Sequence, residues 1–207
     1  MQDAIKRSGT VQAVLKDLRR DIILKKLHDG TQVTELQFSE KYQCSRAALR
    51  GAITVLEHEG LVRIMPNGTK WICSLTTEDI NNLYELRTYV ECSAVKQALK
   101  KGIINASGLL KIIEEVEGGS DFLDCDARFH ETLIDMSGNK ALMQMWKTFI
   151  PVTRELFALN SSHSVSVREA FQERHMLITK MLMNKDEKVV EMLETHINEA
   201  RELSLEE

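Results

Sequence analysis

The feature that most constrains the fold is a change of pattern near residue 61. Up to that point apolar residues recur at helical spacing, but "LVRIMPNGTKWICSL", residues 61–75, places two short strand-forming runs on either side of "PNG". Asn-Gly is a strong hairpin signal because the tight turn between two antiparallel strands needs residues that accept a positive φ. Almost no strand signal follows later in the chain. The sequence therefore predicts one small β-hairpin in a chain that is otherwise helical.

Two helical patterns lead toward this hairpin. The first occupies residues 11–29, and its inward face consists of Val11, Leu15, Leu18, Ile22 and Leu27. Gly30 stands where a glycine is expected just after the last turn of a helix. The second pattern opens at Thr34, a favourable N-cap with Gln37 at the capping-box position, and should end near Tyr42.

A third helical pattern opens at Ser45, again a favourable N-cap, and stops at Gly60. Three short helices followed by a hairpin make a winged helix-turn-helix, whose second motif helix enters the DNA major groove with its N-terminal residues leading. Those residues here are Ser45, Arg46 and Arg50. Arginine binds guanine through two hydrogen bonds or clamps phosphate. Two arginines alone would be interpreted as a solvated face, but the cap, the spacing, the glycine and the hairpin together favour DNA contact.

The distribution of charge agrees with this division of the chain. Residues 1–75 hold 12 Lys and Arg against 8 Asp and Glu, whereas residues 76–207 hold 15 against 23. A basic first part and an acidic second part indicate that only the first part meets a polyanion. We therefore expect a winged helix-turn-helix DNA-binding domain at residues 1–75 and a second domain at residues 76–207.

The second part is predicted to be an antiparallel bundle of six helices. The expected helices cover about residues 76–101, 105–117, 121–136, 139–159, 165–184 and 184–204, with a serine-rich loop over residues 160–166. Short connections between successive helices are typical of such bundles. The fold class is thus mainly α, with the hairpin as its small β element.

Three of these helices carry a histidine on the apolar face, and one of them also carries an aspartate. In "DARFH", Asp126 and His130 lie four residues apart and share one helix face. His175 and His196 lie within the apolar stripes of the last two helices. One inward histidine is ordinarily a hydrogen-bonded core residue, but three beside a carboxylate are hard to satisfy in that way. A divalent metal ion, which binds neutral imidazole and carboxylate, removes the difficulty.

The other histidines need no such explanation. His163 falls in the serine-rich loop, and His28 and His58 lie near helix ends in the first domain, so all three are interpreted as solvated. Zinc is the favoured ion at the four inward residues, while nickel and manganese are also chemically reasonable.

Arg87 lies on the apolar stripe of the helix at residues 76–101. An inward arginine suits recognition of a carboxylate. The alternative is a structural ion pair with Glu91, which follows one turn later. Both interpretations stay open on the residues alone.

The segment "TELQFSEKYQCSRAALRGAITVLEHEGLVRIMPNGTKWI" resembles the DNA-binding domain of the GntR family of bacterial transcription regulators, over about residues 11–75. The resemblance implies that Ser45, Arg46 and Arg50 are recognition-helix contacts and that Gly68 lies on the wing near the minor groove. The chain departs from the family pattern at Leu36, where a basic residue is common, and at Ala47 and Ala48, where Thr-Pro is common. It also departs at Gly51, which replaces a common glutamate and should cost the helix about 1 kcal/mol relative to alanine.

Residues 76–207 resemble the FCD effector domain found in the FadR branch of GntR regulators. The resemblance lies in "DARFHETLIDMSGN", "ERHMLITKML" and "ETHINEAR". It implies a metal held by Asp126, His130, His175 and His196, and a small carboxylate effector bound beside it. It also favours an effector-binding role for Arg87, and six helices fit the shorter variant of that domain.

Together these features predict a ligand-responsive bacterial repressor that binds an inverted-repeat operator as a homodimer. One alternative is a regulator for which the metal itself is the signal. Another is a metal-dependent hydrolase or lyase fused to a DNA-binding domain, but the sequence offers no evident general base beyond the ligands, so an enzyme is not expected.

The sequence also points to the cytoplasm. The N-terminal residues have no apolar core typical of an export signal, and no apolar stretch approaches the roughly 18 residues that a membrane span needs. The four cysteines form no CxxC pair, which favours free thiols.

Overall fold

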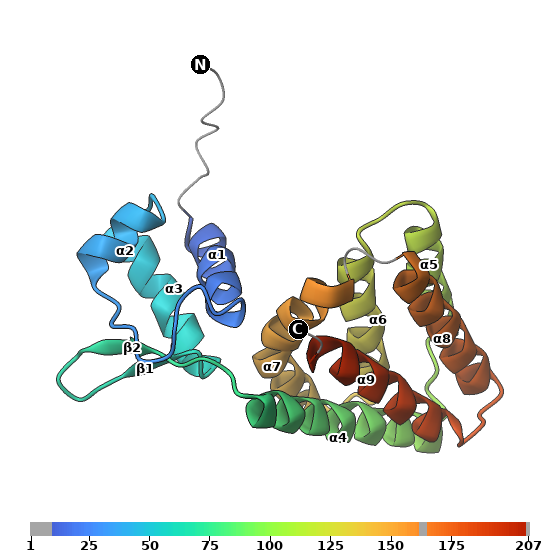
Figure 1. Ribbon diagram of the computed structural model, residues 1–207. Coiled ribbons are helices and arrows are strands. Elements are labelled where there is room, and N and C mark those ends of the chain that lie inside the picture. The colour runs from blue at the N-terminus through green and yellow to red at the C-terminus, as the bar shows by residue number, and fades with distance from the viewer. Residues whose placement is uncertain (1–9, 162–164, 206–207) are drawn as a thin grey trace. The chain divides into compact units, whose positions relative to one another are not determined.

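The computed structural model describes residues 10–161 and 165–205, and it is mainly helical (Figure 1). Contacts divide the chain into two compact units, with the boundary in the sequence between Thr76 and Thr77. The first unit contains α1 (Val11–Ile23), α2 (Glu35–Lys41), α3 (Arg46–His58), β1 (Val62–Ile64) and β2 (Lys70–Ile72). The second contains α4 (Thr77–Lys101), α5 (Ala106–Glu117), α6 (Phe122–Met136), α7 (Lys140–Ser161), α8 (Val165–Met183) and α9 (Val189–Leu205).

The first helix is shorter than predicted. α1 ends at Ile23, and Lys25 adopts a left-handed conformation with φ of 55°. Leu27 is nevertheless buried, in a turn that its N–H ties back to the Asp21 carbonyl of α1 at 3.0 Å. Gly30 does not cap the helix, since its N–H donates to the carbonyl of Ile72 in β2. The apolar spacing thus predicted burial correctly at Leu15, Leu18, Ile22 and Leu27. It was wrong for Val11, which is exposed at the first residue of α1, and for the extent of the helix.

The two helices of the DNA-binding motif begin where the caps were predicted. The Ser45 hydroxyl accepts a hydrogen bond from the Ala48 N–H at 3.1 Å and so satisfies a free donor in the first turn of α3. Thr34 occupies the N-cap position of α2 but makes no such bond. Its hydroxyl donates instead to the side-chain oxygen of Gln37 at 2.9 Å.

The hairpin forms at the predicted turn. β1 and β2 pair antiparallel, with Val62 opposite Ile72. Gly68 adopts a φ of +80° and its N–H donates to the Met65 carbonyl at 2.8 Å, a turn conformation that residues with a Cβ rarely accept. Three helices and this hairpin confirm the winged helix.

The described residues of the second unit form the six helices that were predicted, with one clear shift. α9 begins at Val189 rather than near residue 184, because Lys185 adopts a φ of 53° and a turn separates it from α8. α7 ends at Ser161 and α8 begins at Val165, so both helices extend into the predicted serine-rich loop. The rest of that loop, with His163, lies outside the described residues.

The core of this unit is built around α4 and α6. α4 runs alongside α9 and also packs against α6 and α7, while α5 packs against α6 and α8 (Figure 1). Phe129 and Leu133 of α6 are fully buried between these helices. This packing points the inward faces of α6, α8 and α9 at one another. None of the helices in the described residues is long and apolar enough to cross a membrane.

Candidate functional site

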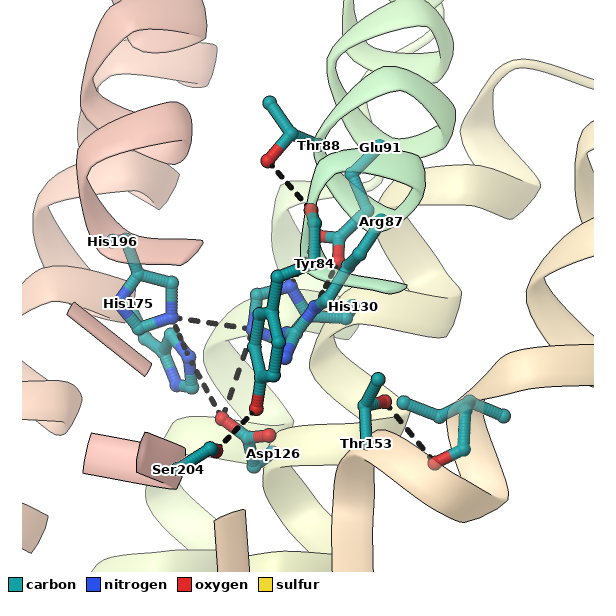
Figure 2. A network of polar contacts seen from close by, with 11 residues as sticks. Tyr84, Arg87, Thr88, Glu91, Asp126, His130, Thr153, His175, His196 and Ser204 are labelled. Carbon is teal, nitrogen blue, oxygen red and sulfur yellow. Dashed lines mark hydrogen bonds and ion pairs between the residues drawn. The ribbon is translucent and has the colours of Figure 1, made fainter. Parts of the chain in front are cut away.

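Four predicted side chains meet inside the second unit. Asp126 and His130 come from α6, His175 comes from α8 and His196 comes from α9, and all four are buried (Figure 2). One potential ligand atom from each lies within 4.8 Å of the other three. Residues that are up to 70 positions apart in the sequence are therefore gathered into one polar cluster in an apolar core.

The atoms that converge are those a metal ion would need. The Nε2 atom of His196 lies 3.1 Å from Nε2 of His175 and 3.2 Å from Nε2 of His130. Oδ1 of Asp126 lies 3.4 Å from Nε2 of His175 and 3.7 Å from Nε2 of His130. Donor atoms about 2.1 Å from an ion are about 3.0 Å apart at a right angle and about 3.4 Å apart at the tetrahedral angle. The separations of 3.1, 3.2 and 3.4 Å fall in that range, and the separation of 3.7 Å between Asp126 and His130 lies just outside it.

Hydrogen bonding inside the protein leaves this cluster incompletely satisfied. Oδ1 of Asp126 and Nδ1 of His196 are buried without a hydrogen-bond partner among the described residues. The contacts of Asp126 with the imidazoles are too long for good hydrogen bonds. Unsatisfied buried polar atoms are costly, and a cation would give the Asp126 oxygen a partner. The donor set, the spacing and this unsatisfied oxygen fit a divalent metal.

The electrostatics of the cluster favour the protonation states that bind metal at three of the four residues. Burial would raise the pKa of the Asp126 carboxyl, but His130 and His175 outweigh it and hold that pKa well below its usual range. Burial lowers the pKa of His175, and burial together with the two neighbouring imidazoles lowers the pKa of His196 well below its usual range. An ionised carboxylate and neutral imidazoles are the forms that coordinate metal.

His130 differs because a second carboxylate faces it. Burial lowers its pKa, but Glu91 raises it, and the net direction is upward. Glu91 lies on α4, is fully buried, and places Oε2 at 2.5 Å from Nδ1 of His130. From the sequence, Glu91 was expected only as a partner for Arg87. The position of Glu91 on the inward face of α4 could have indicated a buried partner. The contact with His130 could not be predicted in this way, because the two residues are 39 positions apart in the sequence.

Arg87 lies beside this cluster, as Figure 2 shows, and is 3% exposed. Its Nε donates to Oε1 of Glu91 at 2.6 Å, the ion pair that the sequence offered as the alternative to effector binding. The guanidinium carbon lies 5.9 Å from the centre of the Tyr84 ring and 5.7 Å from that of Trp146. Arg87 is therefore held in a defined place next to the cluster.

The predicted DNA contacts lie on α3 and the hairpin of the first unit. Ser45, Arg46, Arg50 and Gly68 are all exposed. Arg50 is not a free cation, because its Nη1 donates to Oε2 of Glu35 on α2 at 2.9 Å. No pattern in the sequence pointed to Glu35.

Comparison with known proteins gives the chain a family. The sequence model of the FCD domain matches residues 82–199. The gluconate operon transcriptional repressor of Bacillus licheniformis is 23% identical over 88% of this chain and 79% of its own length. The transcriptional repressor RspR of Escherichia coli K12 is 24% identical over 92% of this chain and 87% of its own length.

Solved structures show the same fold. A structure reported as Lar, which controls the Listeria monocytogenes agr system, superposes with a TM-score of 0.74 at 19% identity and full coverage of both chains. A GntR-type transcriptional regulator from Rhodococcus sp. RHA1 gives a TM-score of 0.64 at 22% identity, over 94% of this chain and 97% of that one. The two relatives from Bacillus licheniformis and Escherichia coli are both named as transcriptional repressors. The chain therefore belongs to the FadR-type branch of the GntR transcription regulators, whose C-terminal part is an FCD domain.

Proposed function

We propose that this regulator is a homodimeric repressor whose operator affinity is set by a small carboxylate bound at a metal in the second unit. The convergence of Asp126, His130, His175 and His196 supports the metal most directly. Zinc is the favoured ion, with nickel and manganese as alternatives, because imidazole suits the later first-row metals and one carboxylate is compatible with each.

A metal bound here would supply an open coordination position for a carboxylate oxygen of the effector. The protein would supply the counter-charge and the shape. A guanidinium has five N–H donors, and the contact with Glu91 uses the one on Nε of Arg87. We propose that the remaining donors of Arg87 face the second carboxylate oxygen. One relative is named for a gluconate operon, and gluconate is a small carboxylate.

On DNA, each subunit would place α3 in the major groove of one half-site and the hairpin against the adjacent backbone. Ser45, Arg46 and Arg50 would contact the major groove, and Gly68 would let the wing approach the minor groove. Effector binding would shift the dimer between arrangements with different operator affinity. That shift requires the effector to bind the two arrangements with different affinity.

The test begins with an operator selected from random DNA by the metal-loaded protein. Operator affinity is then measured for protein stripped of metal, for protein loaded with each metal, and for loaded protein with a panel of small carboxylates. A carboxylate that changes affinity only when metal is present supports the proposal. If metal alone causes the full change and no carboxylate adds to it, the protein is a metal-responsive regulator instead.

The same assay tests Arg87. Arg87→Met should leave DNA binding intact and remove the response to the carboxylate, because the methionine keeps the side-chain volume and loses the donors. An unchanged carboxylate response in this variant would reject the proposed role of Arg87.

A further inference from the structure

Glu91 is a buried carboxylate that the proposed metal site does not use as a ligand. It is fully buried on α4, yet both of its oxygens have a partner. Oε2 lies 2.5 Å from Nδ1 of His130, and Oε1 accepts from Nε of Arg87 at 2.6 Å. A carboxylate removed from water is costly unless such partners compensate it. Its retention in this core therefore calls for an explanation in terms of those two partners.

The contact with His130 determines which ring nitrogen carries the proton. An ionised carboxylate only accepts hydrogen bonds, so Nδ1 of His130 must be the donor. A neutral imidazole has a single N–H, which leaves the lone pair on Nε2. That atom lies 3.2 Å from Nε2 of His196 and 3.7 Å from Oδ1 of Asp126, within the cluster. Glu91 thus favours the tautomer in which His130 presents a lone pair to the other ligands.

We propose that Glu91 is a positioning residue that fixes the tautomer and ring orientation of His130 for metal binding and holds Arg87 beside the same site. The inference rests on the metal site of the proposed function and goes beyond it. Nδ1 of His196 is buried without a partner among the described residues, so the Glu91 contact gives His130 an anchor that His196 lacks. Because one carboxylate bridges His130 and Arg87, it also links the metal ligand to the residue proposed for the effector.

Glutamine is the informative replacement. In Glu91→Gln the new side chain has nearly the same size as the carboxylate but only one oxygen, and its other terminal atom is an NH₂ donor. His130 and Arg87 both donate, so the amide could satisfy one of them and would oppose the other. Loss of an outer partner of a ligating histidine typically weakens metal affinity by about 10–100-fold. We expect a loss of that size in Glu91→Gln.

The experiment uses the full chain, stripped with a chelator and titrated with Zn²⁺ against a competing indicator. Leu109→Ala is the matched control, because Leu109 is fully buried on α5 of the same core and α5 supplies no ligand. It should lower the melting temperature while leaving zinc affinity within about threefold of wild type. If Leu109→Ala loses as much affinity as Glu91→Gln, the effect is one of stability and the inference is wrong.

A second measurement needs no variant at position 91. Imidazole ¹⁵N spectra of the zinc-loaded wild type, assigned by comparison with His130→Asn, should show His130 protonated on Nδ1 and free of hydrogen on Nε2. A proton on Nε2 would overturn the inference even if Glu91→Gln failed to fold. If wild type binds zinc and Glu91→Gln binds it with the same affinity, the proposed role of Glu91 is wrong and the metal site stands. Wild type that binds none of the three candidate metals would reject the proposed metal site, and the inference with it.

Discussion

At the scale of single residues, Glu35 changes how the DNA-binding surface is understood. Its two oxygens contact Arg50 at 2.9 Å and Lys70 of the hairpin at 3.5 Å. Burial raises the pKa of Glu35, but Arg50 and Lys70 together outweigh it and lower that pKa. Glu35 therefore connects the recognition helix to the wing, and it places a negative charge beside groups expected to meet phosphate.

Arg46→Ala and Arg50→Ala should each weaken operator binding. If the arginine contacts a base, its replacement should weaken operator binding by about 1–3 kcal/mol and relax the sequence preference at one position. If the arginine clamps phosphate, its replacement should weaken binding to all DNA. It should also reduce the dependence of log affinity on log salt concentration by about one. Fluorescence anisotropy at several salt concentrations separates the two cases, with Lys111→Ala on α5 as the control. Unchanged affinity in both arginine variants would reject the predicted placement of α3.

Glu35→Gln should strengthen binding to random DNA. Removal of the anion frees Arg50 and Lys70 for phosphate, and an exposed ion pair is worth up to about 1 kcal/mol, or roughly fivefold in affinity. The ratio of operator to random-DNA affinity should fall. Glu40→Gln, an exposed glutamate on the same helix, is the control for net charge. Equal gains in the two variants would mean that position 35 has no special role.

At the scale of elements, the helix propensity at Gly51 of α3 favours alanine, but packing against α1 opposes it. Alanine should favour the helix by about 1 kcal/mol over glycine. A Cβ at this position, however, would lie 3.2 Å from both γ-carbons of Val11 at the start of α1. Val11 is 37% exposed and can move a few tenths of an ångström. The close approach of α1 and α3 leaves little space for a Cβ, which accounts for glycine at this position despite its cost to the helix.

Gly51→Ala should therefore stabilise the protein by less than about 1 kcal/mol. Urea denaturation tests the cause. It gives the change in unfolding free energy caused by Gly51→Ala, once in the wild type and once in the Val11→Ala variant. The gain from alanine should be larger in the Val11→Ala background. The same gain in both backgrounds would show that Val11 does not oppose the substitution.

The metal ligands come from α6, α8 and α9, so a bound ion would link three helices. An ion that binds only the folded state stabilises it by about 2.7 kcal/mol at a free concentration roughly 100 times its dissociation constant. Chelation should accordingly lower the melting temperature of the wild type. His130→Ala should abolish the response to chelator, whereas His58→Ala, an exposed histidine on α3, should retain it. Calorimetry with and without chelator is the measurement, and no shift in wild type would count against a resident metal.

At the scale of the whole molecule, we expect a dimer. A single winged helix makes few phosphate contacts, and regulators of this kind bind two half-sites with two recognition helices. The acidic second part of the chain would not bind DNA, so dimerisation through residues 76–207 would keep both basic units available. Light scattering of the full chain at micromolar concentration should give twice the monomer mass. A monomer both alone and on operator DNA would contradict this prediction.

The sequence by itself determined the order and type of the elements and the faces they bury. Local periodicity and caps such as Ser45 act over a few residues, so the helices of the second unit and the hairpin could be predicted. The same local information placed Asp126 and the three inward histidines on apolar faces. It failed where a turn continued the apolar pattern, as at Leu27 after α1, because burial alone does not distinguish a helix from a turn packed on the same core.

Only the tertiary structure decided which inward groups meet. The residues alone left Arg87 open to an effector or to Glu91, and the family resemblance favoured the effector. The structure shows the ion pair with Glu91, one turn along the same helix. The contact of Glu91 with His130 joins α4 to α6, and that of Glu35 with Lys70 joins α2 to the hairpin. The strength of such contacts depends on distances of a few ångströms between segments far apart in the chain. Those distances are set by how whole helices pack, and no local pattern records them.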